Sequence, residues 1–134
     1  MSNIDVGTKI PALELPPISR TTLALYAGAS GDHNPMHIDI DFAKKAGMPD
    51  VFAHGMLSMA YLARMLTNWA PQSQLRRFTN KFSAITQLHD VISCSGSVIE
   101  LLEVNGEKVA RCEIQAVKQS GDLTLIGEAL VAVQ

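Results

Sequence analysis

The fold is decided by the most apolar stretch of the sequence, Gly55-Met-Leu-Ser-Met-Ala-Tyr-Leu-Ala-Arg-Met-Leu-Thr-Asn-Trp69. Its apolar side chains cover nearly the whole circumference of a helix, and a helix that is apolar all round is typically buried. Pro71 stands just beyond the stretch, and a proline cannot continue a helix. The pattern therefore predicts one buried helix over residues 55–69, around which the rest of the chain must pack.

After this helix the sequence changes to the two-residue period of β-strands, from Phe78 onward. The clearest alternation is typical of a strand with one face in water: apolar Ala110, Cys112, Ile114 and Ala116 alternate with Arg111, Glu113 and Gln115. Asn105-Gly106 predicts a hairpin, and Ser120-Gly121-Asp122 predicts a turn before a last strand over 123–133. Three or four consecutive antiparallel strands after one buried helix predict an α+β fold, with a curved sheet wrapped around the helix.

The segment before the helix is broken up by prolines, glycines and helix caps. Residues 6–18 contain three prolines, so they are expected to form an edge strand or an extended arm. Ser19 is expected to cap a short helix over 22–27 that stops at Gly28. Asp39 or Asp41 is expected to cap a second helix over 42–46, closed by Gly47.

The composition indicates one domain over residues 1–134 that is partly covered by another subunit. The chain is 47% hydrophobic and 18% charged, against about 25% charged residues in an average soluble domain. A net charge of -2, with no block of like charge, argues against nucleic-acid binding. Cys94 and Cys112 make no disulfide framework and are expected to be buried thiols.

No segment of the sequence resembles a targeting signal or a membrane span. The N-terminus lacks a basic region followed by an apolar one, so no signal peptide is expected. The apolar run over 55–66 is interrupted by Ser58 and Arg64 and is shorter than the roughly 20 residues that cross a bilayer. A cytoplasmic protein is therefore expected.

Acidic residues and histidines gather in one short segment that includes Asp32, His33, His37, Asp39 and Asp41. The last two aspartates are interpreted as turn and cap residues. Asp32 and His37 differ, because a rigid Asn34-Pro35 step lies between them and fixes their relative direction. A carboxylate and an imidazole on one stiff loop can polarise a shared water molecule, which is the requirement for general acid–base catalysis.

A metal site is the competing interpretation, since aspartate and histidine are both metal ligands. The spacing matches neither H-E-x-x-H nor a cysteine-containing zinc pattern. Gly28, Gly31 and Gly47 likewise form no phosphate-binding motif. Neither a metal nor a nucleotide cofactor is therefore expected.

Gly55 could take part in catalysis through its backbone N–H if it begins the buried helix. The first turn of a helix has unpaired N–H groups and a partial positive charge. A glycine there lets a substrate carbonyl approach the backbone closely. Such an N–H would stabilise negative charge that develops on the carbonyl oxygen; the alternative is that Gly55 only permits close packing.

These residues carry a resemblance to a known family. Tyr26-Ala-Gly-Ala-Ser-Gly-Asp32-His-Asn-Pro-Met-His37-Ile-Asp39, followed by Ala53-His54-Gly55-Met56-Leu57, resembles the hydratase signature of MaoC-like proteins. These proteins are (R)-specific enoyl-CoA hydratases and related 3-hydroxyacyl-thioester dehydratases. The resemblance spans about residues 21–69 and implies a hot-dog fold, in a homodimer or heterodimer with a continuous sheet.

The resemblance also implies the roles of individual residues. Asp32 and His37 would be the catalytic dyad, and the Gly55 N–H the oxyanion donor, with no metal or other cofactor. The residues expected to bind substrate or hold the loop are Asn34, His54, Met56 and Ser58. Some family members carry a serine on the buried helix near the dyad; here those positions are Ala60–Arg64, and only Ser58, nearer the helix start, is available.

The expected reaction is reversible syn addition of water to a trans-2-enoyl thioester, carried by CoA or by an acyl carrier protein. The product is the (R)-3-hydroxyacyl thioester. Two alternatives stay open: a hot-dog thioesterase, and an obligate subunit of a heteromeric dehydratase. Arg76, Arg77 and Lys81 are candidates for binding CoA phosphates, and the methionine-rich helix either lines an acyl tunnel or forms ordinary core.

Overall fold

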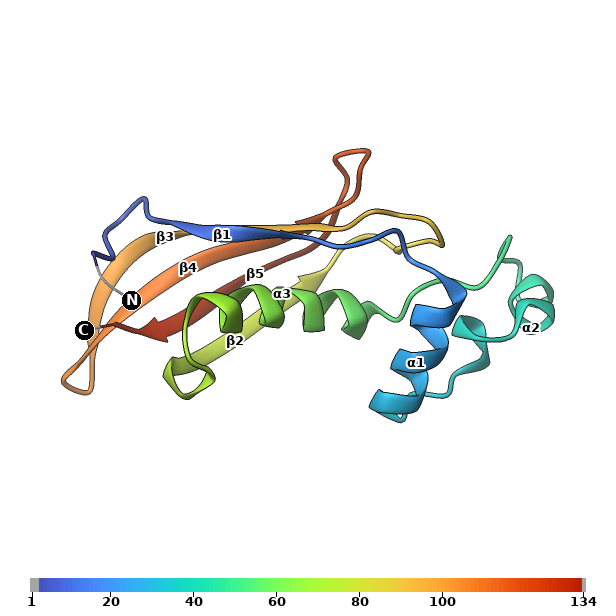
Figure 1. Ribbon diagram of the computed structural model, residues 1–134, viewed down its shortest axis with the longest axis horizontal. Helices are drawn as coiled ribbons and strands as arrows, with labels where there is room; N and C mark the ends of the chain where they lie inside the picture. Colours follow the sequence, from blue (N-terminus) through green and yellow to red (C-terminus); the bar gives the residue numbers. More distant parts are fainter. Residues whose placement is uncertain (1–2, 134) are drawn as a thin grey trace.

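An antiparallel sheet curves around one long helix in the computed structural model, which describes residues 3–133 (Figure 1). Within these residues the sheet has five strands in the order β1-β3-β4-β5-β2: β1 Lys9–Glu14, β2 Leu75–Phe82, β3 Ser93–Val104, β4 Glu107–Val117 and β5 Leu123–Ala132. The helical elements are α1 Arg20–Ser30, η1 Pro35–His37, α2 Ile40–Lys45, α3 Gly55–Trp69 and η2 Gln72–Gln74. The predicted α+β class is confirmed.

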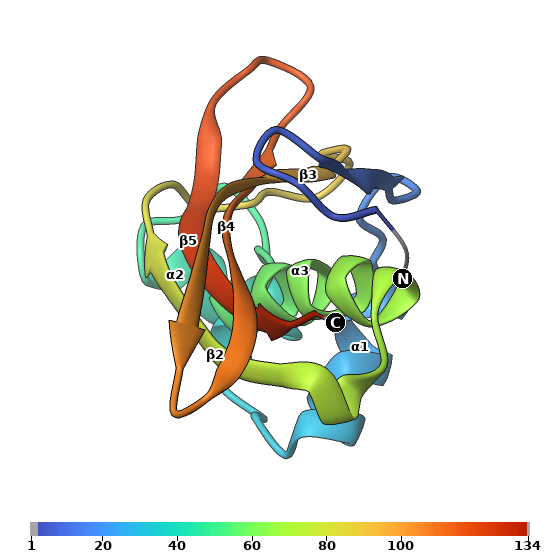
Figure 2. The ribbon, with the colours of Figure 1, turned by 90° about the vertical axis from the view of Figure 1, so that its left-hand side faces the viewer.

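Helix α3 has the bounds that the apolar pattern predicts and lies in the hollow of the sheet (Figure 2). Leu62, Met65 and Leu66 are buried against the inner faces of the strands. The expectation that α3 is buried all round is wrong for this single chain, because Met56 is 51% exposed. The sheet covers the helix from one side only, so the side turned away from it meets solvent.

The strand half follows the predicted pattern closely. Alternate residues of β4 are buried in the core: Ala110, Cys112, Ile114 and Ala116. Asn105 and Gly106 have φ of 52° and 80° and join β3 to β4, the backbone that a two-residue hairpin requires. Strand β2 begins at Leu75, earlier than the alternation from Phe78 suggested, and pairs with β5.

In the N-terminal half, the predicted edge strand and the predicted start of α1 are confirmed, but the predicted end of α1 is not. Strand β1 lies at the sheet edge and pairs with β3, with a register shift after Ile10. The Ser19 side chain caps α1 by accepting a hydrogen bond from Thr22 N–H. The expected stop at Gly28 is wrong: the helix runs on to Gly31, whose φ of 76° supplies the left-handed residue that ends it. A glycine inside a helix costs about 1 kcal/mol, too little to end it.

Cys94 and Cys112 lie on neighbouring strands with no exposed surface, so the prediction of buried thiols is confirmed. Burial raises the pKa of Cys94 to about 12 and that of Cys112 to about 11. Among residues 3–133, no helix has both the length and the apolar character needed to cross a membrane.

Candidate active site

The loop between α1 and α2 is stiffened by hydrogen bonds to its own backbone. The Asn34 side chain accepts from Met36 N–H at 3.1 Å and caps the η1 turn. Asn34 N–H in turn donates to Asp32 Oδ1 at 3.2 Å. Asn34 thus holds the loop and the direction of the Asp32 carboxylate at once.

His37 is oriented by the segment that leads into α3. Its Nδ1 lies 2.7 Å from the Phe52 carbonyl oxygen, and the two rings meet edge to face. A carbonyl oxygen only accepts hydrogen bonds, so Nδ1 carries the proton. The other ring nitrogen, Nε2, is therefore left with a lone pair in the neutral ring.

The structure brings Asp32 and His37 together, as their spacing in the sequence suggests, and adds His54. One carboxylate oxygen of Asp32 and one ring nitrogen each of His37 and His54 lie within 4.8 Å of one another. The two imidazole rings are stacked with centroids 3.9 Å apart and planes at 28°. Lone pairs lie in the ring planes, and the planes of these two rings are nearly parallel, whereas zinc needs nitrogens that converge on one point at about 2.0–2.1 Å. The arrangement suits proton transfer better than metal binding.

His54 lies behind the dyad and is 1% exposed. Its Nε2 is 3.1 Å from the main-chain carbonyl oxygen of Asp32, and the Tyr26 ring contacts its edge. The pKa of His54 is lowered, mainly because the ring is buried and also because His37 is close. The hydrogen bond to Asp32 and the charge of Asp32 act in the opposite direction but do not outweigh this. The sequence predicts that His54 lies just before the helix, but it does not predict which way the His54 ring points.

Gly55 begins α3, and the start of this helix has no side-chain cap. The N-cap residue His54 makes no capping hydrogen bond with its side chain. A Cβ at Gly55 would lie 3.0 Å from two carbons of the Phe82 ring, which covers this point. The first turn of α3 therefore presents backbone N–H groups next to His54, whose ring stacks on His37, and glycine at position 55 leaves room for the Phe82 ring.

A cavity of about 270 Å³ adjoins this helix start. Its wall includes the buried hydroxyls of Ser58 and Thr86, whose oxygens are 3.5 Å apart. The other lining residues are Phe52, Ala53, Gly55, Phe82, Ser83, Ala84, Ile85, Thr124 and Leu125. Of the residues expected to bind substrate, Ser58 lines this cavity and the exposed Met56 does not. Phe82 and Thr86 come from β2 and the segment after it, which sequence reasoning did not connect with the site.

The cationic residues considered for CoA phosphates lie at two ends of β2. Arg76 is near its beginning and donates two hydrogen bonds of 2.8 Å to Glu107. Lys81 is near its other end, beside the Phe82 that covers Gly55. The three residues therefore do not form one cluster within this chain.

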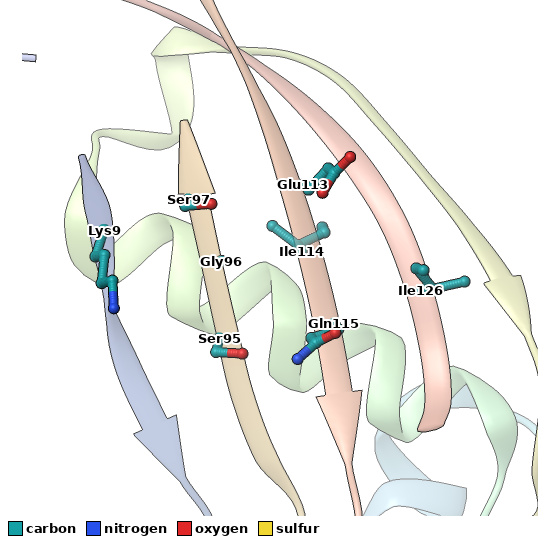
Figure 3. Close-up of a pocket in the computed structure, with 8 residues that line it drawn as sticks. All are labelled: Lys9, Ser95, Gly96, Ser97, Glu113, Ile114, Gln115 and Ile126. Atoms are coloured by element: carbon teal, nitrogen blue, oxygen red, sulfur yellow. The ribbon is translucent and has the colours of Figure 1, made fainter. Parts of the chain in front are cut away.

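A second hollow, of about 300 Å³, lies on the outer face of the sheet (Figure 3). Figure 3 shows its lining side chains on β1, β3, β4 and β5, with α3 behind the strands: Lys9, Ser95, Gly96, Ser97, Glu113, Ile114, Gln115 and Ile126. Asp32 and His37 border neither hollow, but Gly55 and Ser58 at the start of α3 line the cavity of about 270 Å³ and not this one. The outer hollow is therefore not part of the candidate active site.

A family model described as "MaoC like domain" matches residues 5–119. The (R)-specific enoyl-CoA hydratase of Rhodospirillum rubrum is 29% identical over 118 residues, covering 87% of this chain and 80% of that protein. The mitochondrial 3-hydroxyacyl-[acyl-carrier-protein] dehydratase FERN of Solanum lycopersicum is 26% identical over 104 residues and 78% of this chain. This chain spans 63% of FERN and 6% of a third relative, the fatty acid synthase subunit beta of Saccharomyces cerevisiae.

Solved structures show the same architecture. R-hydratase PhaJ1 from Pseudomonas aeruginosa superposes with a TM-score of 0.83 over 98% of this chain and 83% of that one, at 27% identity. The hot-dog class expected from the sequence is thereby confirmed.

Proposed function

The chain belongs to the MaoC-like domain family, as the match over residues 5–119 shows, and from this we propose that it hydrates trans-2-enoyl thioesters reversibly. The product is the (R)-3-hydroxyacyl thioester, in line with the (R)-specific hydratase from Rhodospirillum rubrum. The observation that carries the proposal is the meeting of Asp32 and His37 beside the uncapped start of α3.

In this proposal the dyad holds one water molecule between the Asp32 carboxylate and His37 Nε2. His37 Nε2 is suited to accept a proton from the water, since Nδ1–H is fixed on the Phe52 carbonyl. The water oxygen forms a bond to C3 while the C2–C3 double bond opens. The proton is then returned to C2 from the same pair, so both new bonds form on one face.

Gly55 N–H is proposed to stabilise the negative charge that builds up on the thioester oxygen. This charge would lie at the positive end of α3, where the N-cap residue His54 makes no side-chain hydrogen bond to the N–H groups. In other enzymes one such donor contributes roughly 3–4 kcal/mol to the transition state. The adjoining cavity, with Phe82, Ile85 and Ser58 in its wall, is proposed to hold the substrate beyond the reacting carbons.

We further propose that a second hot-dog subunit, either the same chain or a related one, pairs along β2. Among residues 3–133 this strand is hydrogen-bonded on one side only, to β5, and so leaves a free edge. Phe82 and Ile85 are about half exposed beside the candidate site, at 55% and 48%. Light scattering coupled to size exclusion measures this directly, and a monomer would contradict it.

The proposed reaction is tested by the loss of enoyl-thioester absorbance with short, medium and bulky trans-2-enoyl-CoA substrates. Enoyl groups on an acyl carrier protein are tested in parallel, because relatives named for both carriers match this chain. Hydration by the wild type alone, absent in Asp32→Asn and His37→Gln, is the expected result. Release of free thiol instead of hydration would indicate a thioesterase, and activity only after a second hot-dog protein is added would indicate an obligate subunit.

A further inference from the structure

We propose that His54 is a positioning residue, which ties the Asp32 loop to the start of α3 and fixes the plane of the His37 ring. This inference rests on the proposed hydration and deepens it. It assigns His54 a place behind the reacting groups, where its ring reaches the substrate only through Asp32 and His37.

Three contacts of one buried ring carry the inference. His54 Nε2 is 3.1 Å from the carbonyl oxygen of Asp32, across 22 positions of sequence. The ring stacks on the His37 ring with centroids 3.9 Å apart, and it contacts the Tyr26 ring edge to face with centroids 4.9 Å apart. Because the backbone of His54 leads directly into Gly55, the same residue connects the dyad with the proposed oxyanion donor.

The contacts also determine the protonation state of His54. The Asp32 carbonyl can only accept, so Nε2 carries the proton. Nδ1 is buried and has no hydrogen-bond partner among residues 3–133. A second proton on Nδ1 would be buried without an acceptor, which disfavours the charged ring. Tyr26, Asp32 and His37 are the titratable groups around the ring, and burial acts in the same direction by lowering the pKa of His54.

A neutral His54 matters for the chemistry of its neighbour. In the proposed reaction His37 takes a proton from water and becomes an imidazolium. A positive charge on the ring stacked against it would oppose that step, since like charges at this distance disfavour the charged form. A neutral ring holds His37 in place without this cost.

Two variants separate the contacts of His54. His54→Phe keeps a flat ring under His37 but removes the donor to Asp32, and His54→Gln keeps an N–H donor but removes the ring. We expect His54→Phe to lower kcat by about 100-fold with KM changed less than about threefold, since misplacing reacting groups by about 1 Å has effects of this size. His54→Gln is expected to lose less. The matched control is His33→Gln, in the same loop but exposed, with kcat unchanged. Wild-type kcat in His54→Phe, or a loss confined to KM, would overturn the inference.

A measurement on the unaltered protein keeps the inference testable if the variants do not fold. In ¹⁵N spectra of the histidine rings, His54 is expected to be the neutral Nε2–H tautomer at pH 6.5, where an ordinary histidine is about half charged. An Nδ1–H tautomer, or a half-charged ring at that pH, would overturn it. A wild type that hydrates no enoyl thioester would refute the proposed function, and the spectra would still decide the state of His54.

Discussion

Two aspartates of this chain, Asp32 and Asp90, differ in how completely their carboxylates are bonded. Asp90 is 9% exposed and accepts hydrogen bonds from Gln87 N–H at 2.7 Å and the Gln119 side chain at 3.0 Å. Lys118 Nζ adds an ion pair at 3.4 Å. The exposed Asp32 carboxylate accepts one hydrogen bond from the described residues, from Asn34 N–H. A carboxylate that has donors on both oxygens, as Asp90 has, serves the fold. One with an oxygen left over, as in Asp32, can bind water and take part in chemistry.

The largest effect is expected from Asp32→Asn, which keeps the shape of the side chain and removes its charge. Turnover of enoyl thioesters should fall by about 10²–10⁴-fold, the range that a positioned acid–base group contributes. The free energy of unfolding should change by no more than about 0.5 kcal/mol, because the residue is exposed. Steady-state kinetics and urea denaturation of the same preparation measure both. A stable variant with wild-type turnover would show that Asp32 is not in the catalytic machinery.

The opposite result is expected for Asp90→Asn. The amide can turn only one oxygen toward the groups that now donate to the carboxylate, so a partly buried donor loses its acceptor. The free energy of unfolding should fall by about 1–3 kcal/mol, and kcat of the folded fraction should stay within about threefold. Thermal denaturation and kinetics below the new Tm test this. An unchanged Tm would mean that the Asp90 contacts contribute no net stability.

The contribution of Asp90 should also depend on pH. Burial acts to raise its pKa, but the Gln87 N–H, the Gln119 amide and the Lys118 ammonium outweigh it and hold the pKa below its usual range. A carboxyl with a lowered folded-state pKa stabilises the fold above its unfolded pKa of about 3.9 and loses that effect as pH falls further. The Tm difference between wild type and Asp90→Asn should therefore be constant from pH 7 to about 5 and shrink below pH 4. A difference that grows on acidification would contradict this.

The smallest effects are expected from substitutions at the two helix starts. The start of α1 is capped by the Ser19 side chain, whereas the start of α3 has no side-chain cap. Gly55→Ala places a methyl group 3.0 Å from the Phe82 ring, which is about half exposed and can shift. We expect kcat to fall about tenfold, since the carbonyl is kept from the N–H. The matched variant Ser19→Ala removes the cap of α1 and should cost about 1 kcal/mol of stability without affecting kcat. Equal effects of the two variants on kcat would refute a special role for the start of α3.

The parts of the structure that depend on local sequence were predictable. The bounds of α3, the Asn105-Gly106 hairpin and the alternation of β4 follow from periodicity and turn chemistry. Asp32 and His37 are close because one stiff loop holds both. The solvent-exposed side of α3 was not predictable. An apolar pattern indicates that a helix face is covered, but not whether the chain's own sheet or a second subunit covers it.

The parts of the site formed by distant segments were not predictable. Phe82 reaches Gly55 from β2, and Thr86 meets Ser58 across 28 positions. The contact between His54 and the Asp32 carbonyl depends on a ring rotation that no spacing encodes. Helix α1 was predicted too short because Gly28 and Gly31 look alike in sequence, and only the second adopts a left-handed backbone.

The buried cysteines have a practical consequence for work with thiol-bearing substrates. Burial raises the pKa of the two thiols to about 12 and about 11, so both stay almost entirely protonated at pH 7. Thiol–disulfide exchange proceeds through the thiolate, and both sulfurs also lack access to solvent. The folded chain should thus form no mixed disulfides with oxidised pantetheine carriers, so assays and labelling of the carrier thiol can proceed on the native sequence without reducing agents.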